Sequence, residues 1–575
     1  MRRRCFIFAT GILAVSIGVA AQERRPPTTA DYGRWESLGR TALLSRDGAW
    51  LAYPVTRSNR ENELRIASTT GDSGTVAAFG EDPAFSADSR WLAYAIGHSE
   101  EAAADLRASD EPVHRGLGVL ELASMDVETI ANVGSFAFSP EGAHLAVHRE
   151  PARTDPDDED ESDDRIGSDL VVRDLDTGSD VQFANVAEFA WQGDGTLLAM
   201  TIAAEGRTGN GVRIFDAATG ALRALESGDA VFSRLSWREE ADDLAALRSR
   251  SEAGFDCDTH TILVWRGLSG STTEAQAYDP ADGAGFPDGF RIVSDRRPTW
   301  SDDGAAVFVG IRTWEADAGA DKDAPEDDDV EADDPAEVDV WHADDRRIIP
   351  MQRVQAARDR ERSLLSVWHL DANRFVQLGT DLMEELTLLE GQATVVARYT
   401  DPYTFTNMFG RRWLDLDLID VETGARTKAV ERVRHDHGGS ATGRYLLYFK
   451  DGDFWSHDVT NGRQANLTGD VEAAFDNAEF DYPTEERPAY GVAGWTTGDD
   501  AVLLYDRYDI WRVTPDGSAH ARLTDGAEAD VRYRYIDVDG DDDGPGIDVD
   551  KPTYLSAYGQ WTKQSGFARI APGAS

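Results

Sequence analysis

The amino-acid sequence predicts an all-β protein, a β-propeller of WD40-like or TolB-like four-stranded blades. The first observation is a short phrase, a polar turn followed by an apolar run, which recurs about nine times. The second is the spacing of the copies, mostly about 40 to 60 residues, which suits one blade per copy. A β-sandwich is the alternative, but sandwiches do not repeat one phrase at a fixed period. We therefore expect about eight blades, between roughly seven and nine units, and leave open whether the array is complete.

The clearest copy of the phrase lies at residues 495–517. An apolar run from Ala501 to Tyr505 follows a Gly/Asp turn, and a second run from Ile510 to Val513 precedes another turn. Because blades stack face to face, a strand inside a blade is buried on both faces and forms a continuous apolar run. The other copies lie at 45–53, 86–94, 139–147, 193–200, 301–309 and 442–449, with weaker copies at 237–247 and 391–399.

Turns and one helix complete the predicted elements. The pattern D-x-x-T-G occurs at 174–178, 216–220 and 420–424, where the aspartate and glycine are typical of exposed hairpin turns. Within 350–371, arginine and glutamate follow a helical spacing, so we expect one short helix there.

The chain divides into a leader and one long array. Three arginines followed by an apolar stretch that ends in small residues are typical of a secretory signal peptide, which predicts a periplasmic or secreted protein without a membrane span after cleavage. The predicted segments are a signal peptide at 1–21, an N-terminal segment at 22–34, propeller repeats at 35–526 with acidic loops at 155–165 and 315–339, and a β-hairpin with a C-terminal segment at 527–575 that leads towards a domain absent from this sequence.

The charge balance limits the partners. With 57 basic and 106 acidic residues, the formal net charge is −49. Such a surface repels nucleic acid and anionic membranes, so neither is expected as a partner. Salt screens the repulsion between the acidic groups, which is consistent with a saline habitat.

One acidic loop has the spacing of a calcium site. Asp539, Asp541, Asp543 and Asp550 occupy positions 1, 3, 5 and 12 of a calcium-loop template, and Gly544 occupies position 6. The alternative is an acidic hairpin turn, because helices are not predicted on either side. Calcium is thus the one candidate cofactor, and the sequence requires none.

Other candidate chemistry is weak. No G-x-S-x-G nucleophile motif occurs, and we interpret His437 to Gly439 as a turn between blades. His435 and His437 could ligate a metal, but no third ligand is apparent. Cys257 is the single cysteine of the mature chain, and we expect it to be buried and inert beside two aspartates.

Four stretches carry a resemblance to a known family. Residues 489–517, 339–352 and 551–570 resemble the propeller portion of secreted S9 peptidases of the prolyl oligopeptidase and dipeptidyl peptidase IV type, and 32–53 is similar to their mature start. In that family a following α/β-hydrolase domain carries the catalytic serine, aspartate and histidine, and no such position exists in this sequence. Glu485 and Glu486 are similar to the acidic pair by which dipeptidyl peptidases hold a substrate amino terminus.

The resemblance implies a non-catalytic propeller that gates or selects peptides for a serine hydrolase domain, so its expected partners are peptides or that domain. The alternative is a stand-alone periplasmic TolB-like binding or scaffold propeller. An enzyme acting at its own propeller axis, such as a lactonase or lyase, is a third hypothesis, but it requires inward-facing histidines and the chain has 11 in total.

Overall fold

The structure is a computed structural model that describes residues 28–572 except 110–111, 151–165, 253, 256, 272–273, 316–341, 343–344, 409, 411, 485 and 539–545. The chain forms two compact units. One comprises Met1–Phe138, Leu145–Arg153 and Asp174–Thr177, and the other comprises Ser139–His144, Thr154–Arg173 and Gly178–Ser575. Within the described residues, no helix has both the length and the apolar character needed to cross a bilayer.

The first unit contains one five-stranded and one four-stranded antiparallel sheet and a strand pair. The sheets have the orders β1-β3-β4-β5, with β2 also paired to β3, and β6-β7-β8-β9, and β10 pairs with β11. Its elements are α1 (Thr29–Tyr32), β1 (Glu36–Leu38), β2 (Leu43–Leu44), β3 (Trp50–Arg57), β4 (Glu63–Ser68), β5 (Gly74–Ala78), β6 (Gly80–Phe85), β7 (Trp91–Ile96), α2 (Glu100–Ala108), β8 (Gly116–Glu121), β9 (Asp126–Ile130), β10 (Val133–Phe138) and β11 (His144–Arg149).

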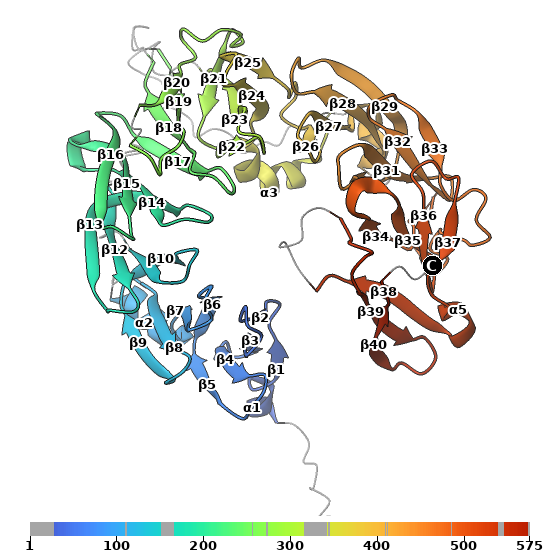
Figure 1. Cartoon of the computed structure of the whole chain (residues 1–575), viewed down its shortest axis with the longest axis horizontal. Helices are drawn as coiled ribbons and strands as arrows, with labels where there is room; N and C mark the ends of the chain where they lie inside the picture. Colours follow the sequence, from blue (N-terminus) through green and yellow to red (C-terminus); the bar gives the residue numbers. More distant parts are fainter. Residues whose placement is uncertain are drawn as a thin grey trace, which may run out of the picture. The chain divides into compact units, whose positions relative to one another are not determined.

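The second unit contains five successive strands of one larger sheet, then a four-stranded, a five-stranded and three further four-stranded antiparallel sheets, followed by one of three strands, coloured from green to red in Figure 1. Its first strands are β12 (Ser168–Asp174), β13 (Asp180–Trp191), β14 (Leu197–Ile202), β15 (Asn210–Asp216), β16 (Ala221–Gly228), β17 (Phe232–Trp237), β18 (Leu244–Arg250), β19 (Thr259–Trp265), β20 (Gln276–Tyr278), β21 (Phe290–Val293), β22 (Thr299–Trp300), β23 (Ala306–Thr313), β24 (Leu364–His369) and β25 (Arg374–Gln377).

The remaining strands of this unit follow in the same order. They are β26 (Glu385–Leu388), β27 (Thr394–Tyr399), β28 (Leu414–Asp420), β29 (Arg426–Val433), β30 (His435–Gly439), β31 (Tyr445–Lys450), β32 (Asp453–Asp458), β33 (Gln464–Asn466), β34 (Val492–Trp495), β35 (Val502–Tyr505), β36 (Ile510–Val513), β37 (His520–Arg522), β38 (Val531–Ile536), β39 (Thr553–Gly559) and β40 (Ser565–Ile570). Its helices are α3 (Ile349–Arg360), α4 (Thr404–Asn407), α5 (Gly526–Ala529) and the 3-10 turns η1 (Glu205–Arg207), η2 (Asp401–Tyr403) and η3 (Thr497–Asp499).

These sheets are propeller blades, and the prediction of about eight blades, between seven and nine units, is confirmed. The described residues form nine antiparallel sheets, of which five have four strands, two have five, one has seven and one has three. Eight of the nine copies of the repeated phrase form the second strand of their sheet, as predicted. The ninth copy is β14, the fifth strand of its sheet, which is buried along its whole length. The strands formed by the phrase are β3, β7, β11, β14, β18, β23, β27, β31 and β35.

The polar turn before several of these strands has one recurring hydrogen-bond pattern. The Ser45 hydroxyl donates to Asp47 Oδ1 over 2.6 Å and accepts the Trp50 N–H over 2.9 Å. Ser301 makes the same two contacts with Asp303 and Ala306, at 2.7 and 2.9 Å. The serine and aspartate therefore satisfy the main chain of the turn, which is why the phrase starts with these residues.

Neighbouring blades of the second unit pack face to face. Ala245, Leu247 and Ile262 of one blade contact a cluster that includes Val307 and Trp368 of the next. All five are fully buried or nearly so. Since both faces of each inner sheet are covered, the apolar runs are continuous.

One long strand pairs with a different neighbour along each half. Residues Asp180 to Val186 of β13 pair with β12, whereas Val186 to Trp191 pair with β14, and all three strands lie in one sheet. The register shifts at Val186 in both ladders, so a bulge bends the strand between its two halves.

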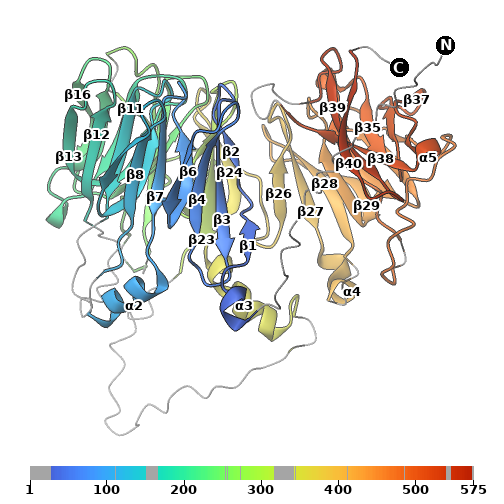
Figure 2. The same ribbon diagram turned by 90° about the horizontal axis from the view of Figure 1, so that it is seen from below.

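The helix expected within 350–371 is α3, and α3 and α4 lie at the lower ends of the second unit's blades in Figure 2. The expectation of a single helix was wrong, because α2 also forms. Ser99 caps α2 by accepting the Ala102 N–H over 3.1 Å, and Glu100 and Glu101 occupy its first turn. This S-E-E start is a helix signal that the repeat pattern obscured.

Candidate functional site

The candidate site is a cavity of about 440 Å³ in the second unit. It lies where the first strands of two successive blades, β30 and β34, meet the sheet β38–β40. The residues that line its floor include Leu447, Trp495 and Ile547, and each of the three is less than 10% exposed. His437, Asp548 and Lys551 bring polar groups to the lining, so the cavity combines an apolar floor with polar groups, as ligand pockets usually do.

An extended segment of the chain itself occupies part of one cavity wall. The Ile547 N–H donates to the Trp495 carbonyl over 2.8 Å, and the Thr497 N–H donates to the Ile547 carbonyl over 3.1 Å. This short parallel bridge adds the segment around Ile547 to the edge of β34. The edge of β34 is therefore able to bind extended polypeptide through main-chain hydrogen bonds.

Next to this bridge, β34 has a bulge. The register of β34 with β35 shifts between Val492 and Gly494, which leaves Ala493 out of the ladder. Ala493 lines the cavity. Gly494 has φ of 150° and Gly546 has φ of 104°, values that favour glycine. A Cβ on Gly546 would lie 2.9 Å from Ala441, so glycine at this position lets the segment around Ile547 lie close to Ala441.

Histidines on β30 were misinterpreted from the sequence. Residues His435 to Gly439 form the first strand of a blade, not the predicted turn. Burial is the main cause, and the charge of Arg434 the next, that lowers the pKa of His435 to about 4, so its ring is neutral at pH 7. Asp436 lies between the two histidines and accepts a 2.5 Å hydrogen bond from Arg398 Nε, which favours a structural role for this carboxylate.

No nucleophile is apparent beside the glycines of β30. Ser440 follows them but is 5% exposed; its hydroxyl donates to Asp499 over 2.6 Å and accepts the Tyr445 N–H over 2.9 Å. Asp499 also accepts hydrogen bonds from the Thr442 hydroxyl and main chain, and it thereby joins two blades. Ser440 is thus part of a turn of the kind described for Ser45.

The predicted calcium loop is only partly described. Asp539, Asp541 and Asp543 lie outside the described residues, and Asp550 lies in an exposed turn in which its N–H donates to Asp548 Oδ1 over 2.9 Å. Among the residues that the structure describes, no group of three or more His, Cys, Asp or Glu is arranged to hold a metal ion. Calcium binding by this loop therefore stays a prediction.

Three further candidates lie elsewhere. Glu485 is outside the described residues, and Glu486 accepts the Asp451 N–H over 2.6 Å, while burial raises the pKa of its carboxyl group. An acidic pair facing a ligand is therefore not brought together in the described part of the chain.

Cys257 is half-buried, so the prediction of a buried thiol was wrong. Phe255, two residues before it in the sequence, is exposed.

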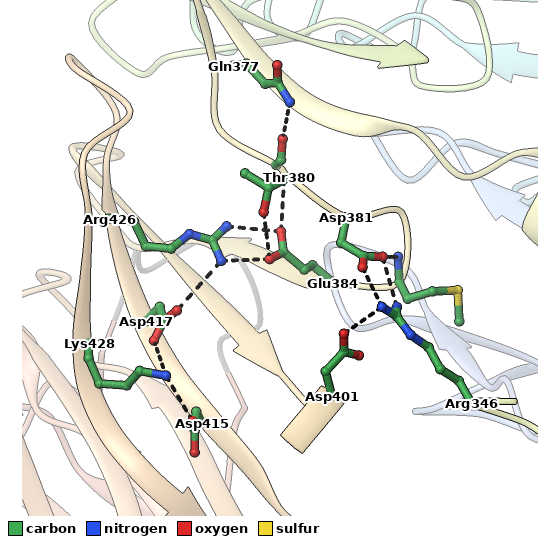
Figure 3. Close-up of polar contacts among 12 residues, drawn as sticks. Arg346, Gln377, Thr380, Asp381, Glu384, Asp401, Asp415, Asp417, Arg426 and Lys428 are labelled. Carbon is green, nitrogen blue, oxygen red and sulfur yellow. Dashed lines mark hydrogen bonds and ion pairs between the residues drawn. The ribbon is translucent and has the colours of Figure 1, made fainter. Parts of the chain in front are cut away.

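A network of ion pairs on the blade β26–β29 was also not predicted (Figure 3). Arg426 donates to both oxygens of Glu384, at 2.7 and 3.1 Å, and Lys428 contacts Asp415 and Asp417 at 2.9 and 3.1 Å. Each of the two cations pairs with at least one carboxylate, which favours a role of this network in stabilising the blade.

Comparisons with known proteins do not assign a family to this chain. No protein-family model and no curated protein matches the sequence. Similar solved structures include a prolyl endopeptidase (13% identity, TM-score 0.32, 74% of this chain and 55% of that chain) and the β-propeller domain of the trilobed protease from Pyrococcus furiosus (9%, 0.28, 68% and 97%). A eukaryotic initiation factor structure is also similar (11%, 0.36, 73% and 85%).

This chain thus spans about half the length of the prolyl endopeptidase structure that it matches, 55%. With TM-scores below 0.5, none of these similarities carries an argument about family or activity. The propeller assignment rests on the strand order described above.

Proposed function

We propose that the chain is the peptide-selecting propeller of a serine peptidase of the S9 type, with hydrolysis carried out by a separate α/β-hydrolase domain. The observation that carries the proposal is the cavity beside β34. Its walls come from the stretches that resemble that family, since Val492–Trp495 lies within 489–517 and Lys551–Tyr554 lies within 551–570.

The cavity suits a short extended peptide. The bridge at Ile547 uses the Trp495 carbonyl and the Thr497 N–H, and the bulged Ala493 lies next along the same strand. A peptide could continue this main-chain pairing while one small apolar side chain enters the apolar floor. A cavity of about 440 Å³ has room for one or two such side chains and excludes a folded domain.

The test is binding of end-blocked apolar tripeptides to the purified chain, measured by isothermal titration calorimetry. We expect saturable binding in the high micromolar to millimolar range, which is about 4 to 6 kcal/mol. Ala493→Phe fills the cavity and should abolish binding. Ala519→Phe, at an exposed turn, is the matched control and should leave binding unchanged. Equal loss in both variants, or no saturable binding to the unaltered chain, would contradict the proposed peptide site.

Hydrolysis by a separate domain is tested independently of peptide binding. Because no G-x-S-x-G motif occurs, the purified chain should neither cleave these peptides nor react with a serine-directed fluorophosphonate probe. The coding sequence beyond residue 575 should contain a serine hydrolase. Peptide binding without an encoded hydrolase would instead favour the stand-alone binding propeller.

A further inference from the structure

The sheet β38–β40 differs in charge from the rest of the chain. Residues 531–536 and 553–570 contain Arg532, Arg534, Lys563 and Arg569 and no aspartate or glutamate. The whole chain, in contrast, has 106 acidic and 57 basic residues. A local cationic sheet in so acidic a protein is a specific feature of its surface.

The register of the sheet separates its two faces. Arg532 lies opposite Tyr558, and Tyr558 lies opposite Ser565, while Ser556 lies opposite Phe567. Side chains at directly opposed positions share a face. The other face contains Leu555 and packs in one apolar cluster with residues that include Leu503, Tyr505, Ile510, Tyr533, Tyr535, Ala568 and Ile570.

The face away from this cluster is exposed and aromatic. Phe567 is 87% exposed. The Arg532 guanidinium and the Lys563 ammonium lie 5.6 and 5.7 Å from the centre of the Tyr558 ring. Arg569, two residues beyond Phe567 on β40, is exposed as well. We call Arg532, Tyr558, Lys563, Phe567 and Arg569 the basic aromatic face; Arg534 is not part of it, because it packs on Tyr505 at 4.3 Å.

The edge of β40 offers main-chain groups beside this face. In the part of the chain that the structure describes, β40 pairs only with β39. The Gly559 N–H donates to the Gln564 carbonyl over 2.9 Å, and bonded pairs alternate in an antiparallel ladder. The N–H and C=O groups of Ser565, Phe567 and Arg569 therefore point away from β39, towards the open edge.

We propose that the edge of β40 and the basic aromatic face bind an extended acidic segment of another protein by strand addition. Its main chain pairs with Phe567 and Arg569, its carboxylates lie near Arg569 and Lys563, and an apolar side chain covers the Phe567 ring. Charge complementarity selects the acidic partner, and the unpaired main-chain groups select polypeptide over nucleic acid.

Electrostatics restrict the partner to a short segment. At physiological ionic strength the Debye length is about 8 Å, so the basic face attracts carboxylates only at close range. A long polyanion would extend over the surrounding acidic surface and be repelled. A peptide strand of about eight residues stays within the sheet.

The test uses a fluorescein-labelled ten-residue peptide in which every second residue is threonine and the residues between are alternately glutamate and valine, so that both of these face the same side. A peptide with lysine in place of glutamate is its charge-reversed counterpart. Fluorescence anisotropy with the 575-residue chain should show saturable binding of the acidic peptide only. Two further acidic peptides carry N-methyl groups on alternate sets of amides, so that the methyl groups lie on opposite edges of the strand. Their affinities should differ, because only one edge of the peptide pairs with β40.

Variants locate the site. Lys563→Glu/Arg569→Glu should weaken binding of the acidic peptide at least about tenfold, which corresponds to about 1.4 kcal/mol. Arg463→Glu/Phe405→Ser changes an exposed arginine and an exposed phenylalanine outside this sheet, and should leave binding within about twofold. Circular dichroism confirms that both variants fold.

Specific results would overturn the proposal. Equal binding of the two N-methylated peptides would exclude strand addition, and equal loss in the control variant would exclude this face. Self-association of the chain that the double charge reversal abolishes would make a second copy the occupant. Stronger binding of labelled single-stranded DNA than of the acidic peptide, again lost on charge reversal, would make nucleic acid the partner.

Discussion

Glu384 illustrates how a buried carboxylate contributes to this protein through its partners. Its side chain is 3% exposed. Burial alone would raise its pKa, but hydrogen bonds from Arg426 and from the Thr380 N–H, together with the Arg426 charge, hold the pKa below its ordinary value of 4.5. The folded state therefore favours the ionised form, and Glu384 stabilises the fold wherever it is ionised.

The sign of the pH dependence follows from that direction. Because the folded pKa is below the unfolded pKa, the contribution is complete above about pH 5 and is lost as pH falls through the folded value. Glu384→Gln should lower the free energy of unfolding at pH 7 by about 1–3 kcal/mol, since it weakens a charged hydrogen-bond pair. The difference between the two proteins should shrink on acidification, measured by urea unfolding between pH 7 and pH 3.

Glu390→Gln, at an exposed position six residues away, is the matched control and should leave the unfolding curve unchanged at every pH. If the effect of Glu384→Gln were the same at pH 3 and pH 7, ionisation of Glu384 would not be its cause.

At the scale of elements, α3 is held by charge instead of apolar packing. None of its residues is buried. Arg346, just before the helix, donates to Asp381 at 2.8 Å and to Asp401 at 2.6 Å, as Figure 3 shows. Asp359, within the helix, pairs with Arg347, which precedes the helix. It also accepts a hydrogen bond of 3.1 Å from Arg362, which follows the helix. Ion pairs therefore anchor the helix at both ends.

Arg346→Gln should loosen α3 without unfolding the blades. We expect faster amide hydrogen exchange across residues 346–362 and a change in melting temperature of less than about 2 °C, because few apolar contacts are lost. Arg358→Gln, on an exposed position of the same helix, is the control. Exchange that rises equally in both variants, or a large drop in melting temperature, would show that helix propensity or packing holds α3 instead.

Elements were predictable from sequence where the signal is local. Eight of the nine copies of the repeated phrase form the second strand of a sheet, since the turn residues and the apolar run of one copy lie within about ten residues. The cavity was not predictable, because it joins His437, Ala493 and Tyr554 from distant parts of the chain. The strand from His435 was missed because polar residues and glycines obscure any alternation, and its pairing with β31 is irregular.

At the scale of the whole molecule, the negative charge opposes folding. A formal net charge of −49 produces self-repulsion that is greater in the compact state. The ion pairs of the exposed surface add little stability individually. The balance therefore favours stabilisation when salt screens the repulsion.

The melting temperature should rise as sodium chloride increases from 0.01 to 1 M, because the Debye length falls from about 30 to about 3 Å. Potassium chloride should give the same curve if screening is the cause, and differential scanning calorimetry measures both. A melting temperature that falls with salt would show that lost ion pairs outweigh the relieved repulsion.

The long strand β13, which pairs with β12 along one half and with β14 along the other, restricts how this sequence can change. Between other blades of the second unit, a loop separates one sheet from the next, so a residue can be added without altering either ladder. Along β13 no loop intervenes, and β12 and β14 take their registers from one continuous stretch. A single inserted residue on either side of Val186 would reverse which side chains of that half face the core. Lengthening at this junction therefore requires compensating changes in a neighbouring strand, whereas single-residue insertions in the other inter-blade loops do not.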